Sequence, residues 1–212
     1  MTKGSETGRI PTATLTGTAL LLALGVVLPI VFHAIPLGGR VFLPMHLPTF
    51  VAGLMLGPVA GLVVGAGSPV LSALLTGRPT VFYMVPMVLE LATYGLLAGL
   101  LRRRFEATGK KLAAWAPRYV AGSSRGIVGR LARLMADGAA PWASVWLALV
   151  CAMVAGRLVW IATVVWLAPV IGLQARTVSM ALGAIGAGWV GMIIQLAIIP
   201  AIVRAIERAR ET

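Results

Sequence analysis

The stretch FLPMHLPTFVAGLMLGPVAGLVVGAGSPVLSALL, residues 42–75, contains one histidine and no other ionisable side chain. Gly57-Pro58 divides it into two apolar runs, residues 42–56 and 59–75. Proline is favoured in the first turn of a helix and disrupts a helix interior, so the pattern predicts two helices joined by a tight turn. Crossing a bilayer takes about 20 apolar residues. The first helix is short for this, so we expect it to tilt or to begin in a re-entrant stretch.

The whole chain has the composition of a membrane protein. Of its 212 residues, 59% are hydrophobic and only 11% are charged, and the mean hydropathy is +0.95. Soluble domains carry roughly 25% charged residues, so this chain cannot cover a water-soluble globule with polar surface. Four more apolar runs have the length of a span: 13–35, 81–101, 142–170 and 178–203. We predict an all-α bundle of six transmembrane helices, a membrane domain at 13–203 between tails 1–12 and 204–212.

Basic residues set the orientation of this bundle. Fourteen of the eighteen lysines and arginines lie in the two tails and in the segment 102–141. Basic loops remain cytoplasmic, so both termini and 102–141 are predicted to face the cytoplasm. The net charge of +12 is then a topology signal, and we expect no nucleic-acid partner.

The 102–141 segment is long for a connection between two spans. Ile127, Val128 and Leu131 share one helical stripe, whereas Arg130 and Arg133 lie mostly away from it. This pattern predicts an amphipathic helix lying on the anionic inner leaflet. The alternative is a solvated basic linker that contains a short helix.

Small residues recur every fourth position in several spans. Examples are Gly53, Gly57, Gly61 and Gly65. This spacing lets helix backbones approach closely in lipid and predicts a compact bundle. Ala19 and Ala23 of the first span show the same spacing, which fits either internal packing or a flat stripe that docks onto another membrane protein.

Two charged side chains fall deep inside predicted spans: Glu90 in the fourth and Arg157 in the fifth. Intramembrane charges are costly, and we expect these two to be paired directly or through water. One interpretation is an ion pair that fixes helix register. The other is the floor of a substrate pocket. Gln195 in the sixth span is predicted to form a hydrogen bond between helices.

The remaining polar residues of the outer side are predicted to gather around one mouth, near the outer surface. They are His33, Arg40, His46, Arg78, Tyr83 and Arg176, together with the soft sulfur of Met45. Three arginines without an outer carboxylate favour an anionic ligand. The histidines either make ordinary hydrogen bonds or ligate a metal-containing ring. We predict no metal site of the protein itself, and the single cysteine, Cys151, excludes an intramolecular disulfide.

Enzymatic functions find little support in the motifs. Ser68 lacks the Gly-x-Ser-Gly arrangement of an intramembrane protease, because Pro69 stands where the second glycine belongs. The chain also lacks a G-x-x-x-x-G-K-[ST] phosphate loop, so it does not hydrolyse nucleotides by itself. A stand-alone transporter or channel, with Glu90 and Arg157 as a coupling element, stays open.

Two segments carry a resemblance to a known family. FLPMHLPTFVAGLMLGPVAGLVVGAGSPVLSALLTGRP (42–79) and MVLELATYGLLAGLLRR (87–103) resemble the substrate-binding S components of energy-coupling factor (ECF) transporters. The resemblance is good over about residues 13–104 and looser through AGRLV at 155–159 and the last span. The long 102–141 segment departs from the compact family pattern.

The resemblance implies a plasma-membrane receptor that binds a vitamin or related micronutrient from outside, with no intrinsic cofactor and no enzymatic activity. It implies partnership with a transmembrane T component and two cytoplasmic ATPases, whose ATP hydrolysis topples the S component and releases substrate inward. Ala19 and Ala23 match the family's docking stripe. An alternative substrate is a haem or a corrinoid held by His33 and His46. The expected substrate-binding residues are His33, Arg40, Met45, His46, Arg78, Tyr83, Glu90, Arg157 and Arg176.

Overall fold

A computed structural model describes residues 11–33, 43–120, 140–170 and 178–211, and every regular element within these ranges is helical. The elements are α1 (Thr12–His33), α3 (His46–Leu56), α4 (Pro58–Thr76), α5 (Val81–Val120), α7 (Ala140–Ala162), the π-helical turn η3 (Thr163–Leu167), α8 (Ala168–Val170) and α9 (Val178–Glu211). Within the described ranges, five helices are long and apolar enough to cross a membrane, and α3 is a shorter apolar helix. The predicted all-α membrane bundle is confirmed.

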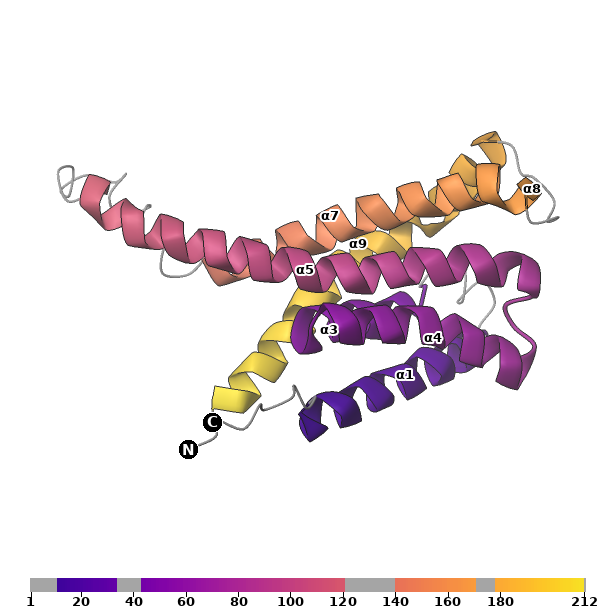
Figure 1. The fold of residues 1–212 in the computed structure, drawn as a ribbon, viewed down its shortest axis with the longest axis horizontal. Coiled ribbons are helices and arrows are strands. Elements are labelled where there is room, and N and C mark those ends of the chain that lie inside the picture. The colour runs from indigo at the N-terminus through magenta and orange to yellow at the C-terminus, as the bar shows by residue number, and fades with distance from the viewer. Residues whose placement is uncertain (1–10, 34–42, 121–139, 171–177, 212) are drawn as a thin grey trace, which may run out of the picture.

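Helix α5 is the centre of the bundle (Figure 1). It packs against α3, α4 and α7, while α1 packs against α3 and α4 and α9 packs against α7 and α3. The first turn of α1 and the last turn of α9 lie at the same end, where α5 projects beyond the other helices (Figure 1). This arrangement agrees with the prediction that both termini face one side of the membrane.

Helix α3 begins inside the bundle rather than at its surface. Its 11 residues rise about 16 Å, roughly half of a 30 Å hydrocarbon core. Leu43 has a positive φ of 48°, and its carbonyl accepts a hydrogen bond from the His46 N–H at 3.0 Å. Pro44 and Met45 are buried within this turn. Irregular backbone within a membrane is tolerated only where it is buried in protein or lines a cavity. The turn before α3 is therefore expected to be enclosed by the other helices or to line a cavity.

Glycines bring α3, α4 and α5 into backbone contact. Gly57 joins α3 to α4 with φ of 108°, a conformation that disfavours any side chain. A Cβ atom added to Gly61 of α4 would lie 2.7 Å from Cα of Gly53 and 2.6 Å from the carbonyl carbon of Gly95. The small residues in these helices therefore serve as packing surfaces, as their spacing predicts.

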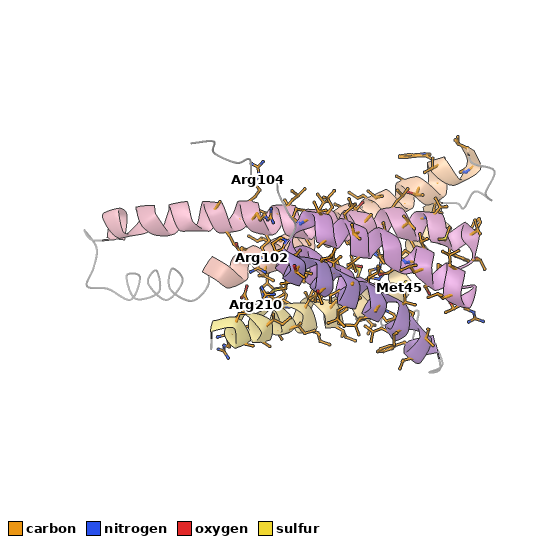
Figure 2. The ribbon with its side chains drawn as sticks, turned by 60° about the horizontal axis from the view of Figure 1, so that its bottom comes forward. Met45, Arg102, Arg104 and Arg210 are labelled. Carbon is orange, nitrogen blue, oxygen red and sulfur yellow. The ribbon has the colours of Figure 1, made fainter. Side chains whose placement is uncertain are left out.

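Arg102 fastens three segments together near the end from which α5 projects. Its Nε donates to Glu106 at 2.6 Å, its Nη1 donates to the Leu54 carbonyl at 2.7 Å, and its Nη2 pairs with Glu207 of α9. Figure 2 shows Arg102, Arg104 and Arg210 toward this end, with Met45 farther along the bundle. We call it the basic end, and it corresponds to the predicted cytoplasmic side.

The extent of α5 differs from the sequence prediction. The fourth span was predicted to end at Leu101, but the helix continues through Val120. Residues 102–120 are mostly good helix formers such as arginine, lysine, alanine and leucine, so the helix continues past the apolar run. We interpret the three consecutive arginines 102–104 as the membrane boundary rather than the helix end. The amphipathic stripe predicted around Ile127 lies outside the described residues, so that prediction stands untested.

Candidate functional site

A polar cluster lies where the start of α3 meets α5 and α7. Oε1 of Glu90 forms an ion pair with Arg157 Nη1 at 2.9 Å and accepts a hydrogen bond from the Tyr94 hydroxyl at 2.7 Å. The same oxygen lies 4.0 Å from His46 Nε2. We call His46, Glu90, Tyr94 and Arg157 the buried polar cluster. The predicted pairing of Glu90 with Arg157 is confirmed, and it is direct.

The local sequence explains how these groups meet. Glu90 and Tyr94 are four residues apart on α5, so they lie on the same helix face. The Tyr94 ring packs at 4.9 Å from the ring of Phe50 and at 5.2 Å from that of His46, measured between centroids. Gly156 of α7 allows this ring to approach, because a Cβ added there would collide with it. Arg157 is the residue after Gly156 on α7, and its side chain extends to Glu90 of α5.

Burying the cluster costs free energy, because its polar and charged groups lose their contact with water. Only 4% of His46, 2% of Glu90 and 1% of Tyr94 is exposed, and the Arg157 side chain is 13% exposed. A buried charge is tolerated when it is paired and hydrogen-bonded, and the Glu90–Arg157 pair meets this condition. The cluster therefore joins the start of α3 to α5 and α7 through polar rather than apolar contacts.

The hydrogen bonding of the cluster is incomplete. Within the part of the chain that the structure describes, both ring nitrogens of His46 and the Nε and Nη2 atoms of Arg157 are buried without a hydrogen-bond partner. Buried polar groups in proteins are nearly always satisfied, because an unpaired one forfeits the hydrogen bonds that water would give it. These atoms are the ones that a bound polar molecule would satisfy.

Helix α9 forms a further side of this region. A Cβ added to Gly188 would lie 3.5 Å from Arg157 Nη2 and 3.3 Å from Leu43 Cδ1. The glycine thus keeps bulk away from the guanidinium. Gln195, two turns further along α9, donates from Nε2 to the Leu43 carbonyl at 3.3 Å. This bond links α9 to the turn before α3. The sequence predicts a hydrogen bond from Gln195 to another helix, and the observed bond goes to the turn that precedes one.

Met45 and His46 are buried between helices. Met45 is only 5% exposed and His46 only 4%. The turn at Leu43 brings the chain among the other helices before α3 begins. The prediction that both residues lie near the outer surface stays a prediction.

The structure does not bring Arg78 and Tyr83 into the cluster. Both are exposed, near the connection of α4 to α5, and Glu90 follows Tyr83 by two turns, about 10 Å along the helix axis. His33 ends α1, but its side chain is not described, and Arg40 and Arg176 lie outside the described residues. Ala19 and Ala23 are exposed on α1.

Tyr94 and Gly188 were not predicted as site residues. The i, i+4 spacing of Glu90 and Tyr94 in ELATY was an available signal for the first, whereas nothing local distinguishes Gly188 from other glycines of the spans. Among the described residues, no group of three or more His, Cys, Asp or Glu side chains could hold a metal ion. The chemistry available in the cluster is hydrogen bonding and ion pairing.

Comparisons with known proteins identify the family. The model of the family described as "ECF transporter, substrate-specific component" matches residues 13–206. No curated protein and no solved structure gives a significant match. The family consists of transport components rather than enzymes. With nearly the whole membrane domain matched, the chain belongs to the substrate-specific components of ECF transporters, which are multi-pass proteins of the plasma membrane.

Proposed function

We propose that this S component captures a vitamin or related micronutrient from outside the cell and releases it inward by toppling, driven by ATPase partners. The observation that carries the proposal is the set of unpartnered buried nitrogens on His46 and Arg157. They lie beside the irregular start of α3, and half-helices that begin at membrane depth are typical of substrate sites in transporters. Family membership supplies the expectation of a T component and two cytoplasmic ATPases.

A haem or corrinoid substrate is less well supported. Axial ligation would require an imidazole that faces an open space large enough for the ring. His46 instead lies buried between Tyr94 and Glu90. A small molecule with hydrogen-bonding groups fits these surroundings better, so we do not carry the tetrapyrrole alternative further.

Uptake should depend on the surface of α1. Replacing both Ala19 and Ala23 with leucine is expected to reduce ATP-dependent uptake at least tenfold, because bulk on the proposed docking stripe keeps the T-component helices apart. Substrate binding by the purified S component should be unchanged. Uptake of labelled substrate and co-purification of the ATPases measure the two effects.

The matched control is the equally spaced, exposed pair Ala197 and Ala201 of α9, whose replacement by leucine should leave uptake intact. Normal uptake by the α1 variant would contradict the docking proposal. Uptake that needs neither ATP nor the ATPases would instead favour a stand-alone transporter with Glu90–Arg157 as its coupling element.

His46→Leu is expected to weaken substrate binding without lowering the stability of the fold. Because neither ring nitrogen has a partner in the described chain, removing them relieves buried unpaired atoms, and the ligand-free melting temperature should stay the same or rise. Substrate affinity should fall about tenfold, in line with a lost hydrogen bond of about 1.4 kcal/mol. Thermal unfolding with and without substrate provides both values.

Ser68→Ala is the control for this variant, since among the described residues that buried hydroxyl bonds to the Val64 carbonyl of its own helix. A large fall in the ligand-free melting temperature of His46→Leu, together with unchanged affinity, would show that His46 is structural.

A further inference from the structure

Among the described residues, the guanidinium of Arg157 has a partner at one of its three nitrogens. Nη1 forms an ion pair with Glu90 Oε1 at 2.9 Å, whereas Nε and Nη2 are buried without a hydrogen-bond partner. In arginine, Nε–H and one N–H of Nη2 point in the same direction and form a planar, two-pronged edge. This edge matches the two oxygens of a carboxylate, which explains why arginine is favoured for bidentate recognition.

We propose that the substrate carries a carboxylate that binds bidentately to the Nε and Nη2 edge of Arg157. This inference rests on the proposed function and adds the chemical class of the substrate. His46 lies against the same Glu90 oxygen and supplies a further hydrogen-bonding group. The N-terminus of α3, which begins at His46, adds a positive end to the surroundings of the bound anion.

Other ligand groups match this edge less well. A neutral amide or a hydroxyl offers a single oxygen, which can accept from both donors only at less favourable angles and brings no negative charge to the guanidinium. A phosphate presents suitable oxygens but carries up to two negative charges, next to an arginine whose charge Glu90 already shares. A single carboxylate satisfies both donors with the smallest uncompensated charge.

Gly188 of α9 lies beside this edge. A Cβ added there would be in van der Waals contact with Nη2 at 3.5 Å. Because Nε and Nη2 are both buried, a carboxylate reaches them by displacing the groups that cover them, and a side chain larger than glycine at position 188 would add to that cover.

The experiment uses the wild-type full-length chain in detergent and the low-molecular-weight fraction of pooled yeast and bacterial extract as the probe. One aliquot is treated with carbodiimide and methylamine, which convert carboxylates into neutral amides. A second receives alkaline phosphatase, and a third receives methylamine alone. The measurement is the rise in melting temperature that each aliquot gives to the ligand-free protein, with mass spectrometry of the retained molecule.

We expect the third and the phosphatase-treated aliquots to stabilise the protein and the amidated aliquot to give no rise. An equal rise with the amidated aliquot would overturn the carboxylate while leaving the proposed function intact. Loss of the rise after phosphatase treatment would assign the anion to a phosphate and would also overturn it. If no aliquot raises the melting temperature, the result contradicts the proposed function and, with it, the proposed carboxylate.

Variants test the same edge in the protein. Arg157→Lys keeps the charge but loses the fork, so affinity for the retained molecule should fall at least tenfold, whereas Arg103→Lys at the exposed basic end should bind as wild type. If Arg157→Lys does not fold, Glu90→Gln combined with Arg157→Gln removes both charges together. Wild-type affinity in whichever variant folds would contradict the proposal.

Discussion

Replacing Glu90 with glutamine is expected to lower the free energy of unfolding by about 3–5 kcal/mol, the usual result of leaving one partner of a buried ion pair uncompensated. Arg157 would keep its charge within the bundle, with its side chain only 13% exposed. Thermal unfolding of the purified protein in detergent measures the effect. An unchanged melting temperature would show that Arg157 finds compensation elsewhere.

The double variant Glu90→Gln with Arg157→Gln completes a double-mutant cycle, which compares its stability with those of the two single variants. Removing both charges should recover much of the lost stability, because no unpaired charge remains. The double variant also separates the two interpretations that the sequence left open. If the pair only fixes helix register, the stable double variant should still bind substrate. If the pair holds the substrate, binding should be lost while the fold survives.

Gly61→Ala is expected to have an effect of similar size for a different reason. The added Cβ would lie 2.7 Å from Cα of Gly53 and 2.6 Å from the carbonyl carbon of Gly95. Both neighbours are backbone atoms of other helices, so no side chain can move aside, and α4 must separate from α3 and α5. We expect a loss of about 3 kcal/mol, at the upper end of the usual range for overpacking.

Gly186→Ala is the matched control, because a Cβ added there meets no atom within 4 Å. Alanine is the better helix former by about 1 kcal/mol, so the control should be neutral or slightly stabilising. Melting temperatures of the two variants, measured side by side, test the packing directly. Equal values would mean that the helix contacts at Gly61 are looser than the structure indicates.

The elements that the sequence predicts well are those governed by composition. Bilayer thickness dictates the length of an apolar run, so the spans of α1, α4, α7 and α9 begin close to their predicted positions. The pairing of Glu90 with Arg157 was predictable because two opposite charges inside predicted spans have few other ways to avoid isolation in lipid.

The site was harder to predict, because it depends on depth and direction rather than on residue type. Leu43 adopts a positive φ that the sequence does not indicate, and the turn there places His46 Nε2 4.0 Å from Glu90 Oε1. Arg78 was predicted to bind substrate from its charge and its predicted side; it is exposed and lies apart from the buried polar cluster, and its role stays a prediction. What a span residue faces depends on the rotation of its helix, which a run of apolar neighbours does not reveal.

The position of the Arg102 contacts has a consequence for inward release. Arg102 links the last turn of α3, α5 and α9 at the basic end, so these helices cannot spread apart there without breaking several charged contacts at once. A path opened between α3 and α9 at this end would first have to break the pair with Glu207 and the bond to the Leu54 carbonyl.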